Sequence, residues 1–184
     1  MDNSQKKLLL SLARESVTAA ISGKKHIVDQ QDEFPKEKRG CFVTLKTHSK
    51  LRGCLGFFVS DEPLYKTVVR LAADAATSDP RFYDNRLSLD ELADLEIEIS
   101  VLSELTKTDD PLSLRLGVDG IYIKSGFSSG CFLPQVATEA NWDAQEFLSY
   151  CCSHKANLAP DAWRDPSVEV FLFTAEIFSE RDFI

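Results

Sequence analysis

Apolar positions recur along the chain with two different periods, and the pattern predicts helices and strands in mixed order. The helical period of about 3.6 residues predicts a first helix over residues 4–21, where Leu8, Leu9 and Leu12 share one stripe. Serine, aspartate and proline at cap positions indicate where other helices begin. The other predicted helices run from a start at 60–63 to a stop at Asp79-Pro80, from the capping box at 88–91 over a short stretch, and over 143–152.

The period of two predicts the strands. Residues 96–103 alternate cleanly, with Ile97 and Ile99 on the inward side. Residues 168–178 are apolar on both faces, which is typical of a strand inside a sheet. Residues 24–39 are polar and irregular, and we expect a surface connection there. The other predicted strands are 41–47, 51–59, and a small hairpin of 120–124 with 131–133. Because helices and strands do not alternate strictly, the predicted fold class is α+β, with a mainly antiparallel sheet flanked by helices.

Composition narrows the classes of function. A formal net charge of −8 argues against binding of nucleic acid or anionic lipid through a broad basic surface. No apolar run is long enough to cross a bilayer or to act as a signal sequence. The five cysteines, an odd number, fit reduced thiols better than a disulfide framework. Cys151, Cys152 and His154 lack zinc-site spacing, and no phosphate-binding motif is present, so no metal or cofactor is expected. These features predict a cytoplasmic protein that binds neither nucleic acid nor membrane.

The two strands after residue 40 are expected to pair as an antiparallel hairpin. Residues opposite each other in a ladder project to the same side of the sheet. Matching the apolar faces therefore places Val43 opposite Leu55, and Thr44 opposite Cys54. The pair of Thr44 and Cys54 then lies on the face away from the core.

A three-residue loop at His48-Ser49-Lys50 gives this register and leaves Lys46 beside Arg52. Cys54 would then lie between two cations and the Thr44 hydroxyl. A thiol close to fixed positive charge shifts toward the thiolate, the form that attacks electrophiles. The same two cations would equally suit a carboxylate or a phosphate.

Gly53 and Gly56 flank Cys54 and would allow another backbone or a ligand to come close. A simpler interpretation is also open. Cys54 would then be a small packed residue, and the two cations would pair with surface acids such as Asp61.

The segment Phe42-Val43-Thr44-Leu45, followed by Leu51-Arg52-Gly53-Cys54-Leu55-Gly56, resembles the signature region of the AMMECR1 domain family. The resemblance covers residues 4–180. Two departures are visible: Leu55 where the family has isoleucine, and Asn157 where it has glycine. Asparagine tolerates the left-handed backbone, so the helix end before Asn157 is expected to persist. Further matches are Pro63-Leu64, Asp79-Pro80-Arg81-Phe82, Glu91-Leu92, residues 96–103, Leu133-Pro134-Gln135-Val136, Trp142, Cys152, Lys155-Ala156, Leu158 and Trp163.

The resemblance implies one domain over residues 1–184, folded as a larger and a smaller lobe with a cleft lined by the Leu51-Arg52-Gly53-Cys54 segment. Prokaryotic members of the family are associated with Memo-like and radical SAM proteins, which implies these as partners in one pathway. The resemblance does not imply a defined reaction.

Four residues outside the hairpin are further candidates. The family match places Arg81 at the rim of the cleft, although an exposed arginine after a helix stop is an equal alternative. His154 and Glu139 are the candidate bases for Cys54. A solvated histidine is the simpler interpretation of the first, and the second would need burial to raise its pKa. Gln135 would supply neutral hydrogen bonds to a polar pocket.

Two functions follow as rival hypotheses. An enzyme or enzyme subunit would use Cys54 for covalent or acid–base chemistry, while Arg52 orients a small anionic molecule and Thr44 supplies a hydrogen bond. A non-catalytic binding module would hold a ligand or peptide and present it to a partner enzyme. A base beside the thiol would favour catalysis, whereas an exposed apolar rim without a base would favour binding.

Overall fold

The computed structural model describes residues 1–28 and 35–183, and these form two compact units. Unit 1 comprises Met1–Val101 and Glu176–Ile184, and unit 2 comprises Leu102–Ala175. Part of the predicted surface connection at 24–39 lies outside the described residues. Its described ends, 24–28 and 35–39, form neither helix nor strand. Over the described chain, no helix is both long and apolar enough to span a membrane.

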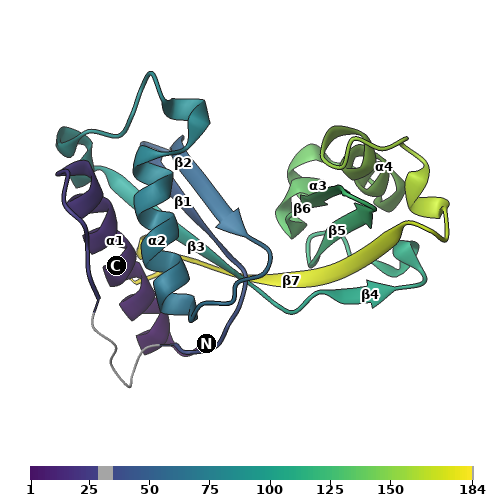
Figure 1. Cartoon of the computed structure of the whole chain (residues 1–184), viewed down its shortest axis with the longest axis horizontal. Coiled ribbons are helices and arrows are strands. Elements are labelled where there is room, and N and C mark those ends of the chain that lie inside the picture. Colours follow the sequence, from purple (N-terminus) through teal and green to yellow (C-terminus); the bar gives the residue numbers. More distant parts are fainter. Residues whose placement is uncertain (29–34, 184) are drawn as a thin grey trace. The chain divides into compact units, whose positions relative to one another are not determined.

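Unit 1 contains three antiparallel strands and the last residues of a further strand, β7 (Glu169–Ser179), with two helices on one face of the sheet (Figure 1). The sheet order is β2-β1-β3, and helix α2 packs on both β1 and β2. The elements are α1 (Asn3–Ile21), β1 (Cys41–Thr47), β2 (Lys50–Phe57), α2 (Leu64–Thr77) and β3 (Leu95–Leu102). The predicted order of elements in this half of the chain is confirmed.

The core of unit 1 lies between the helices and one face of this sheet. Val43 in β1 pairs with Ile99 in β3, Leu45 pairs with Ile97, and all four side chains are fully buried. Successive residues of a strand point to opposite faces, so the alternation seen in the sequence decides which face the helices cover. The prediction that Ile97 and Ile99 point inward is confirmed.

The hairpin of β1 and β2 confirms most of the predicted register. Val43 lies opposite Leu55, and Thr44 lies opposite Cys54. Beyond the next pair the register shifts by one residue, and Lys46 lies opposite Leu51. The prediction that Lys46 lies beside Arg52 is therefore wrong.

The physical reason is the length of the turn. His48 and Ser49 alone form it, with φ values of 50° and 63°, and Thr47 pairs directly with Lys50. A two-residue turn with both residues at positive φ matches the twist of a hairpin, although Asn-Gly is its usual sequence. The predicted three-residue loop is thus one residue too long, and Arg52 becomes the extra residue of a β-bulge.

Unit 2 contains a second antiparallel hairpin with two helices packed beside it (Figure 1). Helix α4 contacts both strands of this hairpin, and α3 contacts its first strand. The elements are β4 (Thr106–Thr108), β5 (Asp119–Ser125), β6 (Ser128–Phe132), α3 (Pro134–Ala140), α4 (Ala144–His154) and β7 (Glu169–Ser179). The second hairpin is longer than predicted because its turn needs only Gly126 and Phe127.

Strand β7 is the longest strand, and it has the interior position predicted for residues 168–178. It has β3 on one side and β5 on the other, in the order β2-β1-β3-β7-β5-β6, while β4 also pairs with β7. An antiparallel sheet flanked by helices is therefore present, and the α+β fold class is confirmed. Short 3₁₀ helices connect these elements at Pro80–Phe82, Leu89–Ala93, Pro111–Ser113, Ala162–Arg164 and Glu180–Phe183.

The ends of α4 are formed as the sequence predicts. Asp143 accepts a hydrogen bond from the backbone of Glu146, and the Glu146 side chain accepts one from the backbone of Asp143. After the helix, Asn157 takes φ 54°, in the left-handed region. Asparagine thus does here what glycine does in the family pattern, and the helix end persists.

Candidate functional site

Cys54 lies in a row of side chains on the face of the unit 1 sheet that the helices do not cover. Thr44 lies opposite Cys54 on one side and opposite Glu98 of β3 on the other. The Thr44 hydroxyl donates a hydrogen bond to Cys54 Sγ over 3.3 Å. Cys54 is partly exposed, whereas Cys41, on the core face, is fully buried. The hairpin therefore presents one thiol, with a hydroxyl beside it, on the open face.

Two side chains close the outer edge of β2 at Cys54. The backbone N–H of Cys54 donates to Asp79 Oδ2 over 2.9 Å, and Arg81 Nη2 donates to the Cys54 carbonyl over 2.8 Å. A neighbouring strand would satisfy the same backbone groups, so Asp79 and Arg81 take the place of a strand at this position. They also bring a guanidinium to the residue that carries the thiol.

The carboxylate of Asp79 holds this guanidinium in place. Asp79 is only 3% exposed, and it accepts hydrogen bonds from Arg81 Nε over 3.0 Å and from Nη2 over 2.7 Å. These bonds keep the pKa of Asp79 below its usual range in spite of burial. They also raise the pKa of Arg81, to which the nearby Cys54 contributes further. Arg81 Nη1 makes no hydrogen bond to any described residue, so one edge of a fixed cation stays open beside Cys54.

Arg52 does not occupy this position. As the bulge residue it is 8% exposed, and its Nε and Nη2 donate to the two carboxylate oxygens of Glu91 over 2.8 and 2.9 Å. Its remaining bonds go to the backbone carbonyls of Asn85 and Arg86. The bidentate pair lowers the pKa of Glu91. Arg52 therefore connects β2 to the segment that follows α2.

Lys46 is also engaged within the sheet. Its ammonium lies 2.9 Å from Glu98 Oε2, one row along from Thr44. The cation beside Cys54 is thus Arg81, rather than Lys46 or Arg52.

The glycines around Cys54 allow close packing inside unit 1. A Cβ on Gly53 would overlap the backbone carbonyl of Ala75 near the end of α2, and a Cβ on Gly56 would overlap the ring of Phe42. Of the two options open from the sequence, approach of another backbone applies to Gly53. Gly56 accommodates an aromatic ring of the neighbouring strand.

The other four cysteines lie in less polar surroundings. Burial raises the pKa of Cys41 to about 12 and that of Cys131 to about 11. It also raises the pKa of Cys151 and of Cys152, both of which are fully buried. A thiol whose pKa is this high is almost wholly protonated at neutral pH and is a poor nucleophile.

The remaining candidates belong to unit 2. His154 is exposed at the end of α4, with its Nδ1 2.9 Å from Ser153 Oγ. Glu139 is exposed on α3, so the burial that a basic role required of it is missing. Gln135, in the first turn of α3, has a buried Oε1 without a hydrogen bond in the described part of the molecule. The described contacts of these three residues are all within unit 2.

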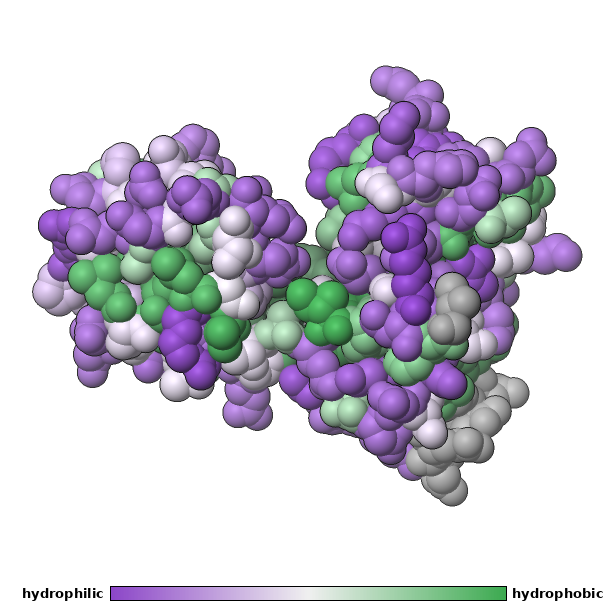
Figure 2. All heavy atoms as spheres, turned by 180° about the vertical axis from the view of Figure 1, so that it is seen from behind, coloured by the Kyte–Doolittle hydropathy of each residue, from purple (hydrophilic) through white to green (hydrophobic). Residues whose placement is uncertain are grey.

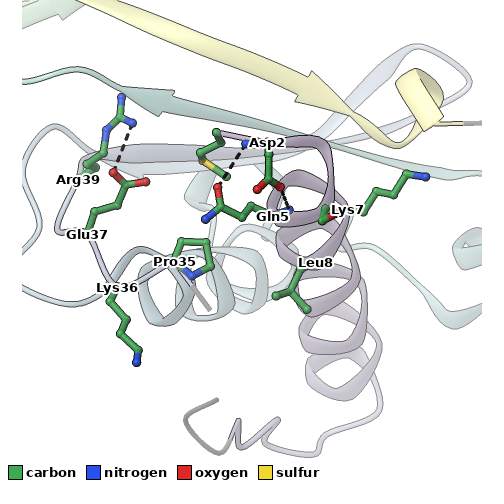
Figure 3. Close-up of a pocket in the computed structure, with 10 residues that line it drawn as sticks. Asp2, Gln5, Lys7, Leu8, Pro35, Lys36, Glu37 and Arg39 are labelled. Carbon is green, nitrogen blue, oxygen red and sulfur yellow. Dashed lines mark hydrogen bonds and ion pairs between the residues drawn. The ribbon is translucent and has the colours of Figure 1, made fainter. Parts of the chain in front are cut away.

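A separate hollow of about 1090 Å³ lies beside the first turn of α1 (Figure 3). Asp2 and Gln5 bond to each other there, and Arg39 pairs with Glu37. Its described lining contains neither cysteine nor histidine, and its two carboxylates are already engaged, Asp2 with Gln5 and Glu37 with Arg39. Among the described residues, no group of three or more His, Cys, Asp or Glu side chains is placed to hold a metal ion.

Comparison with known proteins shows the family of this chain. The model of the AMMECR1 family matches residues 10–178. A protein of Methanothermobacter thermautotrophicus is 39% identical over 94% of this chain and 92% of its own. Protein MJ0810 of Methanocaldococcus jannaschii is also 39% identical, over 91% of this chain and 86% of its own. The chain belongs to the AMMECR1 family.

A crystal structure supports the same assignment. Uncharacterized protein PH0010 from Pyrococcus horikoshii superposes with a TM-score of 0.87 at 36% sequence identity, covering 98% of this chain and 93% of that one. The fold is therefore shared along almost the whole chain.

Asp79 is the site residue that sequence reasoning missed. The sequence indicates it only as part of a helix stop, because an aspartate before proline commonly ends a helix. Its place in the Asp79-Pro80-Arg81 match is the available signal. An acid two residues before an arginine allows a local clamp, but the residue that the clamp would hold depends on tertiary packing.

Proposed function

We propose that this protein is a cysteine-dependent enzyme or enzyme subunit that acts on a small anionic molecule in unit 1. Cys54 is the nucleophile, and Arg81 binds the anionic group of the substrate. The observation that carries the proposal is the clamp at Cys54: Arg81 is fixed by Asp79 and by the Cys54 carbonyl, and its Nη1 has no described partner. A preorganised cation beside a partly exposed thiol is one of the arrangements that support nucleophilic cysteine chemistry.

Each group has a distinct role. The Cys54 thiol loses its proton to solvent, the resulting thiolate forms a bond to an electrophilic carbon, and the electron pair of the bond broken at that carbon leaves with the displaced group. Arg81 orients a carboxylate or phosphate of the same molecule through its open edge. Thr44 stabilises the sulfur by the hydrogen bond of its hydroxyl. Arg52, buried in its pair with Glu91, keeps the strand that carries Cys54 in place.

Two alkylating reagents of nearly equal size test the proposal directly. Iodoacetate carries a carboxylate, whereas iodoacetamide is neutral, and both transfer a carbon to a thiolate with loss of iodide. We expect Cys54 to be the fastest of the five cysteines to react, and its ratio of iodoacetate to iodoacetamide rates to exceed that of any other cysteine. Peptide mapping by mass spectrometry reports each cysteine separately.

Variants of one residue identify the cause of the preference. Arg81→Gln should lower the iodoacetate-to-iodoacetamide ratio at Cys54 about fivefold, as expected for loss of one nearby charge. Arg81→Lys, which keeps the charge, should retain part of the preference even if the glutamine variant is unstable. Arg164→Gln is the matched control, because among the described residues the guanidinium of Arg164 bonds to Gln145 and lies over Trp163, both in unit 2. An inert Cys54, or a ratio that ignores Arg81, would refute the proposal.

A non-catalytic binding module is the second candidate, and one observation favours it. The described carboxylates near Cys54 are both paired with cations, Asp79 with Arg81 and Glu98 with Lys46, and neither is placed as a free base. Exposed apolar residues follow at the end of the same strand and just beyond it: Phe57 is 41% exposed and Val59 is 69% exposed. Such residues suit a partner surface, and on the face drawn in Figure 2 apolar groups lie among hydrophilic ones.

The alkylation experiment separates the two candidates, because a binding module needs no reactive thiol. If Cys54 is inert, binding to Memo-like and radical SAM proteins, the partners suggested by the family resemblance, becomes the next measurement. Loss of that binding on Val59→Asp, with Cys54→Ser unaffected, would support the module.

A further inference from the structure

We infer that unit 2 contains a second anion-binding site, built around Arg115 and independent of Cys54, for a small molecule that bears a carboxylate or a phosphate. The site is a hollow of about 330 Å³ lined by Ser103, Thr106, Ser113, Arg115 and Thr174. Small-molecule pockets range from about 300 to 1,000 Å³, so this hollow suits a small metabolite.

Arg115 is held in the same way as Arg81. The carboxylate of Asp119 accepts hydrogen bonds from Arg115 Nε over 2.9 Å and from Nη2 over 2.7 Å, and Asp119 is 5% exposed. These bonds keep the pKa of Asp119 below its usual range, so the pair stays ionised at neutral pH. Arg115 Nη1 makes no hydrogen bond to a residue that the structure describes, and the side chain is 66% exposed. A fixed guanidinium again presents an open edge.

The sheet register brings hydroxyl groups to this guanidinium. Thr106 of β4 lies opposite Leu172 of β7, and Thr174 is two residues further along the same strand. Thr174 lies opposite Asp119 of β5, so all four side chains project from one face. In the described part of the chain, neither threonine hydroxyl makes a hydrogen bond, and both line the hollow. Their donors are therefore available to a ligand.

The donors define the ligand class. An arginine edge and two hydroxyls match the oxygens of a carboxylate or a phosphate, and Leu172 offers a small apolar surface. Asp119 already balances the charge of Arg115, so the site selects by hydrogen-bond geometry more than by net charge. We expect millimolar binding of the bare anions.

Amide chemical shifts of the ¹⁵N-labelled full chain, titrated with inorganic phosphate and separately with acetate, test this site. Sodium chloride at equal ionic strength is the reference. Phosphate, acetate or both should shift the amides of Thr106, Arg115 and Thr174 saturably, and the anion that does so identifies the chemistry of the ligand. Shifts that sodium chloride reproduces would overturn the inference.

Variants then locate the binding. Arg115→Gln should weaken it about fivefold, and Thr174→Val or Thr106→Val about threefold, as expected for loss of one hydrogen bond each. The threonine variants leave the pair of Arg115 and Asp119 intact, so they report on the site even if Arg115→Gln perturbs folding. Thr138→Val, whose hydroxyl bonds to the Gln135 carbonyl, is the matched control and should bind like the wild type. Equal binding by all variants would place the anion elsewhere and refute the site.

Discussion

Two hairpins of this molecule present a Gly-Cys pair in nearly the same local setting. Gly53-Cys54 lies in β2, and Gly130-Cys131 lies in β6. Each glycine is packed against backbone at the C-terminal end of a helix: Gly53 against Ala75, and Gly130 against Lys155 and Ala156. Each cysteine stands opposite a hydroxyl-bearing side chain of the neighbouring strand. Local sequence and local packing are thus closely similar.

What differs is the environment of the two thiols. Burial raises the pKa of Cys131 to about 11, which the ammonium of Lys155 only partly offsets. Cys54 has instead an arginine anchored by a buried carboxylate, with one edge open. The chemistry of a thiol therefore depends on groups from distant segments, and the Gly-Cys pair alone does not define it.

The largest expected effect is on the shared packing of the two glycines. Gly53→Ala and Gly130→Ala should each lower the free energy of unfolding by about 3 kcal/mol, because an added Cβ meets backbone atoms that cannot turn aside. Both tryptophans lie in unit 2, so urea unfolding followed by tryptophan fluorescence reports Gly130→Ala, and circular dichroism reports Gly53→Ala.

Gly126→Asn is the control for these glycine variants. Gly126 has φ 57°, a Cβ added there would meet nothing within 4 Å, and asparagine tolerates this conformation. Its free energy of unfolding should change by less than about 1 kcal/mol. If Gly53→Ala were as mild, the two hairpins would not share the tight packing on which the comparison depends.

The next effect concerns the buried acids that hold the two arginines. Asp79→Asn should cost about 2 kcal/mol at pH 7, and Asp119→Asn somewhat less, since Asp79 also accepts the Cys54 N–H. Half-exposed arginines keep these costs below those of a fully buried pair. Denaturant titrations of both variants and the wild type measure the difference.

Low pH should remove the difference in unfolding free energy between the wild type and each asparagine variant. The pKa of Asp79 and that of Asp119 are lowered in the folded state, so their contribution is fully present above the unfolded value of about 3.9. It is lost as pH falls from that value through the lower folded pKa. The gap in unfolding free energy between wild type and each asparagine variant should therefore shrink below about pH 4. A gap that stays constant down to about pH 2 would contradict the role of the carboxylates.

The third effect is on the rate at which Cys131 is alkylated. Below a pKa of about 11, its thiolate fraction rises about tenfold per pH unit, so its alkylation by iodoacetamide should rise without a plateau from about pH 7 to 10. Lys155→Gln should slow it about threefold by removing the neighbouring charge. Peptide mapping across the pH series measures the pH dependence of the alkylation rate and the effect of Lys155→Gln. A plateau near about pH 8 would mean that the Cys131 thiol is less buried in solution than in the structure.

The smallest effect is on the hydroxyl beside Cys54. Thr44→Val removes one hydrogen bond to sulfur and should change the alkylation rate of Cys54 about twofold. Thr44→Ser, which keeps the hydroxyl, should restore the wild-type rate. A roughly tenfold loss that serine fails to rescue would point to packing rather than to the hydrogen bond.

Much of the fold is readable in the chain because its causes are local. The alternation around Ile97 and Ile99 places the core face of β3, and the same parity pairs Thr44 with Cys54. The acid at Asp143 begins α4, and Asn157 takes the left-handed conformation that follows it. Side-chain period and backbone preference act over a few residues, so the sequence alone predicts them.

The tertiary structure decided the surroundings of Cys54. His48 and Ser49 form a two-residue turn without the usual glycine, so Arg52 becomes a bulge residue and turns to Glu91. Arg81 reaches the thiol only because the end of α2 brings Asp79 against the edge of β2. Sequence alone determined the main helices and strands except β4 and α3, the core faces of β1, β2 and β3, and the family of the chain. Which cation meets the thiol depends on contacts between segments 25 residues apart, and such contacts follow from packing rather than from any local pattern.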